Sequence, residues 1–189
     1  MITFSFVLQV FLMIILIIIL FLFFLWSIWN LKNKVPFVTA SSAVLKDVAK
    51  AMEIKDDSIV YDVGSGDGKI LFYLSRLNKN AKYIGIENNP FPLFLAKIRA
   101  FFNFRKTGNK VEIISNDFFK QDLSNATHIF TYLYPNIMDD LLPKFKDELK
   151  PGTRLVSLSF RFTTKMPTSE IDLKRSKYKL GRKLYVYEF

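Results

Sequence analysis

The sequence predicts a doubly wound α/β domain, built on a mostly parallel β-sheet and preceded by one transmembrane helix. Three observations lead to this fold class. Short apolar segments alternate with helical patterns after residue 55, a glycine-rich turn follows the first of these segments, and the first 31 residues carry no charged side chain. Short apolar strands that alternate with helices form parallel sheets covered by helices on both faces.

The N-terminal segment is the predicted transmembrane helix. Ile2–Trp29 is an almost continuous apolar run, and about 20 such residues are enough to cross the hydrocarbon core of a bilayer. Trp26 and Trp29 lie near its end, where indole rings favour the membrane interface, and Lys32 and Lys34 follow at once. Positive charge marks the cytoplasmic flank of a span, so we expect a single-pass membrane protein whose domain is cytoplasmic.

Two other interpretations of this segment are a cleaved signal peptide and a buried core helix. A signal peptide needs a basic N-terminal region, a shorter apolar stretch and a small-residue cleavage site, and the segment has none of these. A charge-free run of this length is uncommon in a buried helix. We therefore divide the chain into an anchor over residues 1–31, a linker and N-terminal helix over 32–54, and a domain over 55–189.

Local patterns predict the elements of the domain. The first helix is expected over Ala43–Met52, with a serine N-cap supplied by Ser41 or Ser42. The expected parallel strands are Ile59–Val63, Tyr83–Ile86, Val111–Ser115, His128–Leu133 and Leu155–Phe160. The helices expected between them are Lys69–Leu77, Phe91–Arg105 and Ile137–Glu148. No helix separates Ile171–Leu173 from Leu184–Phe189, so this pair predicts an antiparallel hairpin that completes a seven-stranded sheet.

Composition excludes several kinds of chemistry. The chain has no cysteine and one histidine, His128, which argues against disulfides, thiolate metal sites, a cysteine nucleophile and a Ser-His-Asp triad. We expect no metal and assign His128 a structural role. The formal net charge of +10 fits a nucleic-acid backbone or an anionic membrane leaflet. Because the chain has an anchor and no nucleic-acid-binding motif, we expect an anionic membrane surface as a partner, and not nucleic acid.

A glycine-rich loop after the first strand carries the strongest functional signal. Its residues are Asp62, Gly64, Ser65, Gly66, Asp67 and Gly68. Glycines at alternate positions permit a tight turn and a close approach of a ligand to the backbone. Pyrophosphate-binding loops have the spacing G-x-G-x-x-G, and two carboxylates would repel a pyrophosphate. Asp62 and Asp67 instead favour a cationic amino-acid ligand such as S-adenosylmethionine, and the loop resembles motif I of the methyltransferases that use this cofactor.

Further polar residues follow the second and third strands. Glu87 ends the second strand roughly 20 residues beyond the loop, where an acid can bond both ribose hydroxyls, and Asn88 comes next. Asp117 follows the third strand and can accept from the adenine amino group, while Phe118 can pack on the ring. Because the carboxyl ends of parallel strands meet in one crevice, we expect these residues and the glycine loop to form one cofactor site.

The assembled residues resemble a narrower family, the membrane-anchored protein-lysine methyltransferases of mitochondria that modify the adenine nucleotide translocase and the ATP synthase c-subunit, with their prokaryotic relatives. The matching segments are Val35–Ser41, Asp62–Lys69, Gly85–Pro90, Asn116–Phe119 and Leu149–Ser157, together with the apolar segment before the domain. The resemblance implies the seven-stranded methyltransferase sheet and methylation of a lysine ε-amine of a protein in or near the membrane. The segment Tyr132-Leu133-Tyr134-Pro135 departs from the aromatic pattern expected after the fourth strand.

A lysine acceptor must be neutral before it can attack, and burial against aromatic walls lowers its pKa. Tyr132 and Tyr134, after the fourth strand, and Phe37, before the domain, are the candidate catalytic residues of such a wall. The alternative is that the tyrosines are ordinary core or rim aromatics. Enzymes that methylate nucleic-acid bases usually carry Asp/Asn-Pro-Pro-aromatic at this place, and this chain does not.

Two other functions stay open: methylation of a small-molecule or lipid acceptor, and a cofactor-binding module without activity. The intact glycine loop and Glu87 argue against the module. Two further segments have simpler interpretations. The run Phe101–Phe104 is expected to be buried packing on a helix, and the basic tail from Arg161 to Lys183 is expected to contact lipid headgroups or an acidic target, or to form a solvated face.

Overall fold

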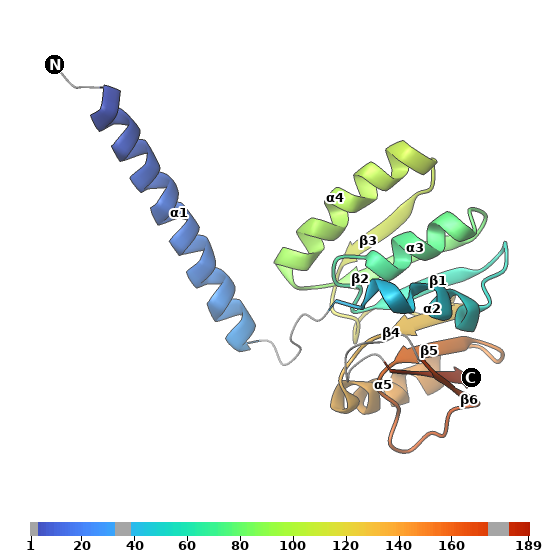
Figure 1. Cartoon of the computed structure of the whole chain (residues 1–189). Coiled ribbons are helices and arrows are strands. Elements are labelled where there is room, and N and C mark those ends of the chain that lie inside the picture. Colours follow the sequence, from blue (N-terminus) through green and yellow to red (C-terminus); the bar gives the residue numbers. More distant parts are fainter. Residues whose placement is uncertain (1–3, 33–38, 174–181) are drawn as a thin grey trace. The chain divides into compact units, whose positions relative to one another are not determined.

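A computed structural model describes residues 4–32, 39–173 and 182–189 of the chain (Figure 1). The chain forms two compact units, Met1–Pro36 and Phe37–Phe189, and each is described by itself. Three features expected from the sequence lie outside the described part: Phe37, most of the basic tail (residues 174–181), and the side chains of Trp26 and Trp29.

The N-terminal unit contains one helix, α1 (Phe4–Lys32). Its 29 residues measure about 43 Å, more than the roughly 30 Å hydrocarbon core of a bilayer. The stretch Phe4–Phe24 has a mean hydropathy of 3.3 and is not buried. By length and composition, α1 can therefore cross a membrane.

The second unit is built on a seven-stranded sheet with the order β3-β2-β1-β4-β5-β7-β6. Its strands are β1 (Ile59–Val63), β2 (Lys82–Glu87), β3 (Val111–Ser115), β4 (His128–Thr131), β5 (Arg154–Leu158), β6 (Ser169–Asp172) and β7 (Lys183–Glu188). β1 to β5 run parallel, and β7 runs antiparallel to both β5 and β6. The predicted doubly wound α/β sheet and its closing hairpin are confirmed, with β7, not β6, next to β5.

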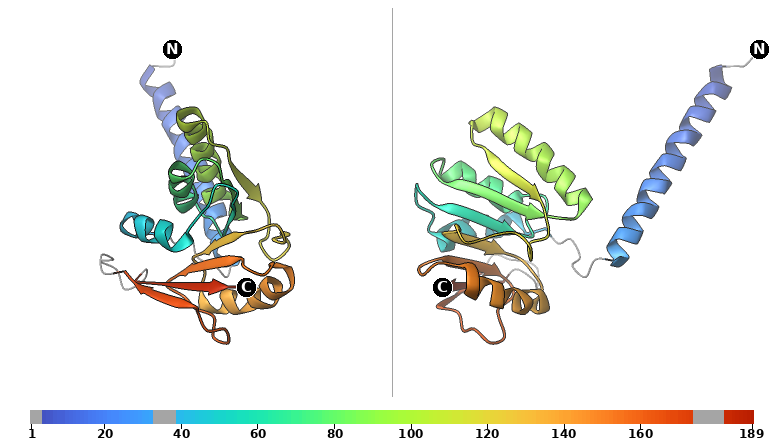
Figure 2. Two further views of the ribbon diagram at one scale, coloured as in Figure 1. Left: turned by 90° about the vertical axis from the view of Figure 1, so that its right-hand side faces the viewer. Right: turned by 180° about the vertical axis from the view of Figure 1, so that it is seen from behind.

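Helices cover both faces of this sheet, as expected (Figure 2). They are the 3-10 turn η1 (Ser42–Val44), α2 (Leu45–Met52), α3 (Lys69–Leu77), α4 (Pro90–Thr107) and α5 (Pro135–Glu148). α2 and α3 pack with Val60 and Phe130 in one core, whereas the sulfur of Met138 in α5 meets the Thr131 hydroxyl at 3.3 Å. Because successive strand residues point to opposite faces, α5 lies on the face away from α2 and α3.

Two boundaries show how the local sequence sets the elements. Ser41 accepts a hydrogen bond from Ala43 N (3.3 Å) and caps η1, as predicted. Pro135 occupies the first turn of α5, where its missing N–H loses no helical hydrogen bond, and Tyr134 before it is extended. β4 ends at Thr131, two residues before its predicted end.

α2 is part of the core of the domain. Val48 and Met52 are fully buried, and Arg154 of β5 donates from Nε to the Ala51 carbonyl (2.7 Å) and pairs with Glu53 (2.8 Å). The compact unit Phe37–Phe189 thus includes the helix predicted before residue 55, and this helix, α2, packs with the sheet.

The expectation of buried packing in Phe101–Phe104 is wrong for its three phenylalanines. Phe101, Phe102 and Phe104 are 55%, 63% and 55% exposed, and only Asn103 is buried. Asn103 faces α3, where its Oδ1 accepts from Arg76 Nε (3.1 Å). α4 thus turns a polar residue toward the domain and its aromatic residues away from it.

Candidate active site

The predicted site lies where the order of the parallel strands reverses. β1 pairs with β2 on one side and with β4 on the other, so that Val63 has Ile86 and Thr131 as partners in register. In open α/β sheets this switch point forms a crevice beyond the carboxyl ends of the strands. The glycine loop leaves β1 here, Glu87 ends β2 here, and Tyr132 follows β4 here.

Three glycines give the loop its shape. Gly64, Gly66 and Gly68 have φ angles of 77°, 55° and 73°, in the left-handed region that glycine adopts readily. A Cβ atom on Gly64 would also come within 2.8 Å of Leu133 Cδ2. The loop therefore packs directly against the segment that follows β4.

The Glu87 carboxylate lies between the loop and the start of α4. Its Oε2 accepts a hydrogen bond from Gly66 N (2.8 Å), and its Oε1 accepts one from Asn89 N (2.7 Å). Burial raises the pKa of Glu87, while these backbone hydrogen bonds act in the opposite direction. The Glu87 carboxyl group is thus held in a buried position by two backbone donors, and its remaining lone pairs can accept further hydrogen bonds.

Asp62 is the most strongly perturbed acid of the site. It is buried in β1, and desolvation, together with the nearby carboxylates of Glu87 and Asp67, raises the pKa of Asp62 to about 8. Acids with strongly raised pKa values in a crevice are typical of functional sites. Because three carboxylates converge here, a cationic ligand would be favoured.

Ser65 has an unsatisfied hydroxyl. Its Oγ is the only buried side-chain polar atom without a hydrogen-bond partner within residues 4–32, 39–173 and 182–189. The backbone N–H groups of Ser65 and Gly64 are satisfied, since both donate to the Ile86 carbonyl (2.9 and 3.0 Å). A buried polar group without a partner costs about 1–3 kcal/mol, so the Ser65 hydroxyl fits a site that a polar ligand completes.

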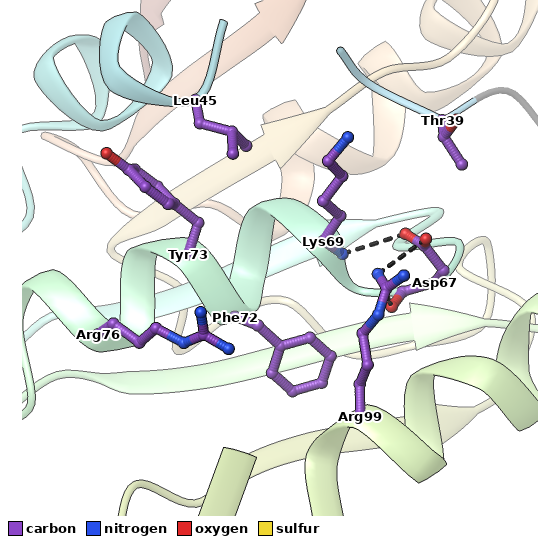
Figure 3. Close-up of a pocket in the computed structure, with 8 residues that line it drawn as sticks. All are labelled: Thr39, Leu45, Asp67, Lys69, Phe72, Tyr73, Arg76 and Arg99. Atoms are coloured by element: carbon purple, nitrogen blue, oxygen red, sulfur yellow. Dashed lines mark hydrogen bonds and ion pairs between the residues drawn. The ribbon is translucent and has the colours of Figure 1, made fainter. Parts of the chain in front are cut away.

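Asp67 has protein partners of its own (Figure 3). One carboxylate oxygen pairs with Arg99 Nη1 of α4 (2.8 Å), and the other accepts from Lys69 N at the start of α3 (3.2 Å). These contacts tie the loop to both helices. Asp67 also borders a cavity of about 330 Å³ beside α3, lined by Thr39, Leu45, Asp67, Lys69, Phe72, Tyr73, Arg76 and Arg99. Asp67 is the only predicted cofactor residue in this lining.

The residues predicted for the adenine ring follow β3. Asp117 Oδ1 accepts from Phe119 N (3.0 Å), which fixes a tight turn. Phe118 is buried and Phe119 is 39% exposed, with ring centroids 4.9 Å apart. The turn therefore places a half-buried carboxylate beside two aromatic rings.

The residues after Glu87 have different roles. Asn88 is exposed and remains a predicted cofactor residue. Asn89 is buried and caps α4, accepting from Phe91 N (3.2 Å) through its side chain. Sequence reasoning missed Asn89, although an asparagine followed by proline at a helix start is an N-cap signal.

An aromatic cluster lies at the carboxyl ends of β4 and β5. Tyr132 stacks on Phe160 with ring centroids 6.2 Å apart, and the Tyr134 ring is 5.3 Å from the same phenylalanine. All three residues are partly buried, and burial raises the pKa of Tyr132. Leu133, between the tyrosines, is the residue that meets Gly64, so the cluster adjoins the glycine loop.

Phe160 is a candidate site residue that sequence reasoning missed, because the pattern assigned it to the end of a strand. β5 ends at Leu158, and Ser159 follows with a φ angle of 71°, which is uncommon for a residue with a side chain. Such backbone strain is found preferentially at functional sites. The turn at Ser159 lets Phe160 lie against the tyrosines that follow β4.

His128 lies at the opposite end of β4. It is buried, its Nδ1 is 2.8 Å from the Thr127 hydroxyl, and burial lowers the pKa of its imidazole. Its position at the amino end of the strand fits the structural role expected for it. Among the residues that the structure describes, no group of three or more His, Cys, Asp or Glu side chains could hold a metal ion.

Comparison with known proteins identifies relatives of this chain. Residues 62–169, more than half of the chain, match the family described as the ANTKMT methyltransferase domain. A protein-lysine N-methyltransferase from Saccharolobus islandicus is 32% identical over 81% of this chain and 92% of its own length. A human lysine N-methyltransferase named for the ATP synthase c-subunit is 28% identical over 68% of this chain, and this chain spans only 53% of that protein.

A solved structure extends the comparison to the cofactor. A Salinibacter ruber protein described as an RNA methyltransferase, in complex with S-adenosyl-L-homocysteine, has a TM-score of 0.72 and 28% identity, covering 80% of this chain and 93% of its own. The converging carboxylates and the unpaired Ser65 hydroxyl fit a ligand of this kind, which combines polar groups with a cationic amine. The chain therefore belongs to the family of the ANTKMT methyltransferase domain, and it is an S-adenosylmethionine-dependent methyltransferase.

Proposed function

We propose that the protein methylates the ε-amine of a lysine in another protein, and that α1 anchors it in a membrane. The observation that carries the acceptor assignment is the aromatic cluster Tyr132, Tyr134 and Phe160, which adjoins the glycine loop through Leu133 and Gly64. The relatives named as lysine methyltransferases support the same acceptor.

Each end of the cofactor has candidate partners in the crevice. Glu87 would accept hydrogen bonds from the ribose hydroxyls, and Asp62 would be ionised beside the ammonium group of the methionine part. Ser65 Oγ would gain the partner that it lacks. Asp117 and Phe118 are the candidates for the adenine amino group and ring, while the glycines allow the ligand to approach the backbone closely.

The protein's task in this chemistry is to orient the acceptor and exclude water. Bound S-adenosylmethionine supplies a methyl group on a positively charged sulfur, so no nucleophilic side chain of the enzyme is required. The acceptor nitrogen needs a free electron pair and an in-line approach. Tyr132, Tyr134 and Phe160 would form a wall that desolvates an incoming lysine, lowers its pKa and favours loss of its proton to solvent before attack.

The N-terminal helix and the charge of the domain support a membrane location. α1 is long enough to span a bilayer, and the whole net charge of +10 lies after residue 31, which would attract the domain to anionic headgroups. Lys32 and Lys34 after the span indicate that the domain is cytoplasmic. Relatives named for the ATP synthase c-subunit and the adenine nucleotide translocase favour a membrane protein as the substrate.

Transfer of a radioactive methyl group tests this proposal. The full chain is incubated with labelled S-adenosylmethionine and membranes, and the label is then counted in extracted protein, lipid and RNA. We expect protein labelling that acid hydrolysis traces to methyl-lysine. The matched control is Glu87→Gln, which keeps the size of the side chain and removes its charge. Label found only in lipid or only in RNA would contradict the lysine acceptor.

A further inference from the structure

The outer face of α4 is apolar, although it packs against nothing in the described part of the domain. Phe91, Phe94, Phe101 and Phe102 are 51%, 62%, 55% and 63% exposed, and Ile98 is 39% exposed. Phe104, elsewhere on the helix, is also 55% exposed. Aromatic residues contribute large apolar areas, so a helix with five exposed phenylalanines, four of them on one face, needs an explanation.

Helical spacing places these residues in one strip. At 100° per residue, positions 91, 94, 98, 101 and 102 fall within about a third of the helix circumference. The opposite side of α4 carries Pro92, Ala96 and Asn103, and these are the buried residues of the helix. α4 therefore departs from the usual arrangement of a surface helix, because its large aromatic residues lie on the exposed side and its buried side holds only small or polar residues.

Cations accompany this strip, and no acid does. The 18 residues of α4 include Lys97, Arg99, Arg105 and Lys106 and no aspartate or glutamate. Arg99 is neutralised by Asp67, and Arg105 lies over the Phe101 ring at 4.8 Å. By the same spacing Arg105 falls inside the strip, while Lys97 and Lys106 fall at its two margins. Long cationic side chains can reach lipid headgroups from these positions.

Two partners could cover this face of α4: a second copy of the chain or a membrane. The charges on α4 favour the membrane. Pairing two α4 helices through the strip would place Lys97, Arg105 and Lys106 of both copies in one interface, with no acid on either helix to offset their charge. Phenylalanines flanked by lysine and arginine are instead the composition of helices that lie in the interface of an anionic bilayer.

We propose that α4 is an interfacial membrane-docking helix whose strip, Phe91, Phe94, Ile98, Phe101 and Phe102, inserts among anionic lipid headgroups. The inference rests on the membrane location proposed above and adds an orientation to it. α4 begins three residues after Glu87, and its capping residue Asn89 is bonded to the Glu87 carboxylate.

α4 therefore starts beside the carboxyl ends of the parallel strands, where the predicted cofactor residues lie (Figure 1). Phe91 and Phe94 lie in the first turns of α4, next to the carboxyl ends of the strands. With the strip in the headgroup layer, the crevice would lie at the membrane surface. The acceptor lysine would then be one located at the membrane–water interface, and not one far out in a soluble domain.

Single cysteines in the full chain test the docking, because the natural sequence has none. An environment-sensitive fluorophore is attached to Phe94→Cys, Leu16→Cys or Lys146→Cys, and each protein is reconstituted in vesicles of phosphatidylcholine and phosphatidylserine. Leu16 reports on the α1 span. Lys146 is an exposed residue of α5, on the other face of the sheet. Quenching is measured with a spin-labelled lipid and with aqueous iodide, and cofactor binding checks that each variant folds.

At position 94 we expect quenching by the spin-labelled lipid and at least threefold weaker quenching by iodide than at position 146. The additional substitution Phe102→Asp should reduce the lipid quenching at 94 and leave cofactor affinity unchanged. Equal access of iodide to positions 94 and 146 would overturn the docking. A label at position 94 that is shielded from iodide but not quenched by the lipid would also overturn it, because a second copy covering the strip would give that result. Failure of the lipid to quench position 16 would overturn the α1 anchor, a separate result.

Discussion

The substitution Asp62→Asn is predicted to stabilise the cofactor-free protein and to weaken its affinity for S-adenosylmethionine. Asp62 is buried, and desolvation, with the Glu87 and Asp67 carboxylates, raises its pKa to about 8 from an ordinary value of 3.8. Between these two pH values the folded chain binds more protons at this position than the unfolded chain does. Folding stability is therefore lost as the pH rises through this window.

The size of the effect follows from the same shift. Because of this raised pKa, Asp62 lowers the free energy of unfolding by an amount that depends on pH. The loss is on the order of 4 kcal/mol at pH 7 and on the order of 2 kcal/mol at pH 5. A buried asparagine amide would offset roughly 1–3 kcal/mol of the gain, because its own polar atoms need partners. We therefore expect Asp62→Asn to be roughly 1–3 kcal/mol more stable than the wild type at pH 7, and less so at pH 5.

Thermal unfolding of the full chain in detergent, at pH 5 and pH 7, measures this difference, and calorimetry measures cofactor affinity. Asp57→Asn is the control, because Asp57 is an exposed acid in the turn before β1. The control should change neither quantity. A stability difference between wild type and Asp62→Asn that does not grow from pH 5 to pH 7 would refute the reasoning, and so would an unchanged affinity for the cofactor.

Three further predictions concern the loop, the ribose acid and the acceptor wall. Gly64→Ala should lower the free energy of unfolding by roughly 2–5 kcal/mol, because of left-handed backbone strain and the clash with Leu133. Urea unfolding measures this loss, and a loss below about 1 kcal/mol would show that the loop adjusts freely. Glu87→Gln should weaken cofactor binding about 10- to 100-fold in calorimetry, since a hydrogen bond to a charged acceptor contributes roughly 1.5–3 kcal/mol to binding. An unchanged affinity would exclude Glu87 from the site. Phe160→Ala should lower kcat/KM for the acceptor at least tenfold and leave cofactor affinity unchanged. The control is Phe104→Ala, because Phe104 is an exposed residue of α4 outside the predicted site. Equal kinetic effects of the two variants would count against the acceptor wall.

Local patterns were sufficient for most of the fold. The strand Ile59–Val63 and the helix Lys69–Leu77 have the predicted bounds, because apolar runs and helical spacing are properties of a few consecutive residues. The glycine loop could also be predicted, since its left-handed turns demand glycine at alternate positions.

Other features depend on contacts between distant segments, which local patterns do not report. Phe160 joins Tyr132 only because β5 lies beside β4 and Ser159 turns the chain back. Likewise, Asp67 of the loop forms its ion pair with Arg99 of α4, which is 32 positions away in the sequence.

α4 shows the limit of composition most clearly. Phe101 and Phe102 are apolar, and sequence alone places them in a core because burial of apolar area is favourable. The shape of the surface that a helix covers decides which face of the helix is buried. In α4 the buried face contains Ala96 and Asn103. A helix with apolar residues on most of its sides leaves this choice open in the sequence.

Identification of the methylated residue is the most direct test of the proposed lysine methylation. Membranes are incubated with S-adenosylmethionine and either the full chain or its Glu87→Gln variant, and membrane proteins are then digested and analysed by mass spectrometry. We predict methyl-lysine in a membrane protein, at the membrane–water interface, in the wild-type sample alone. Methylation that is confined to lipid, RNA or a residue other than lysine would contradict this prediction.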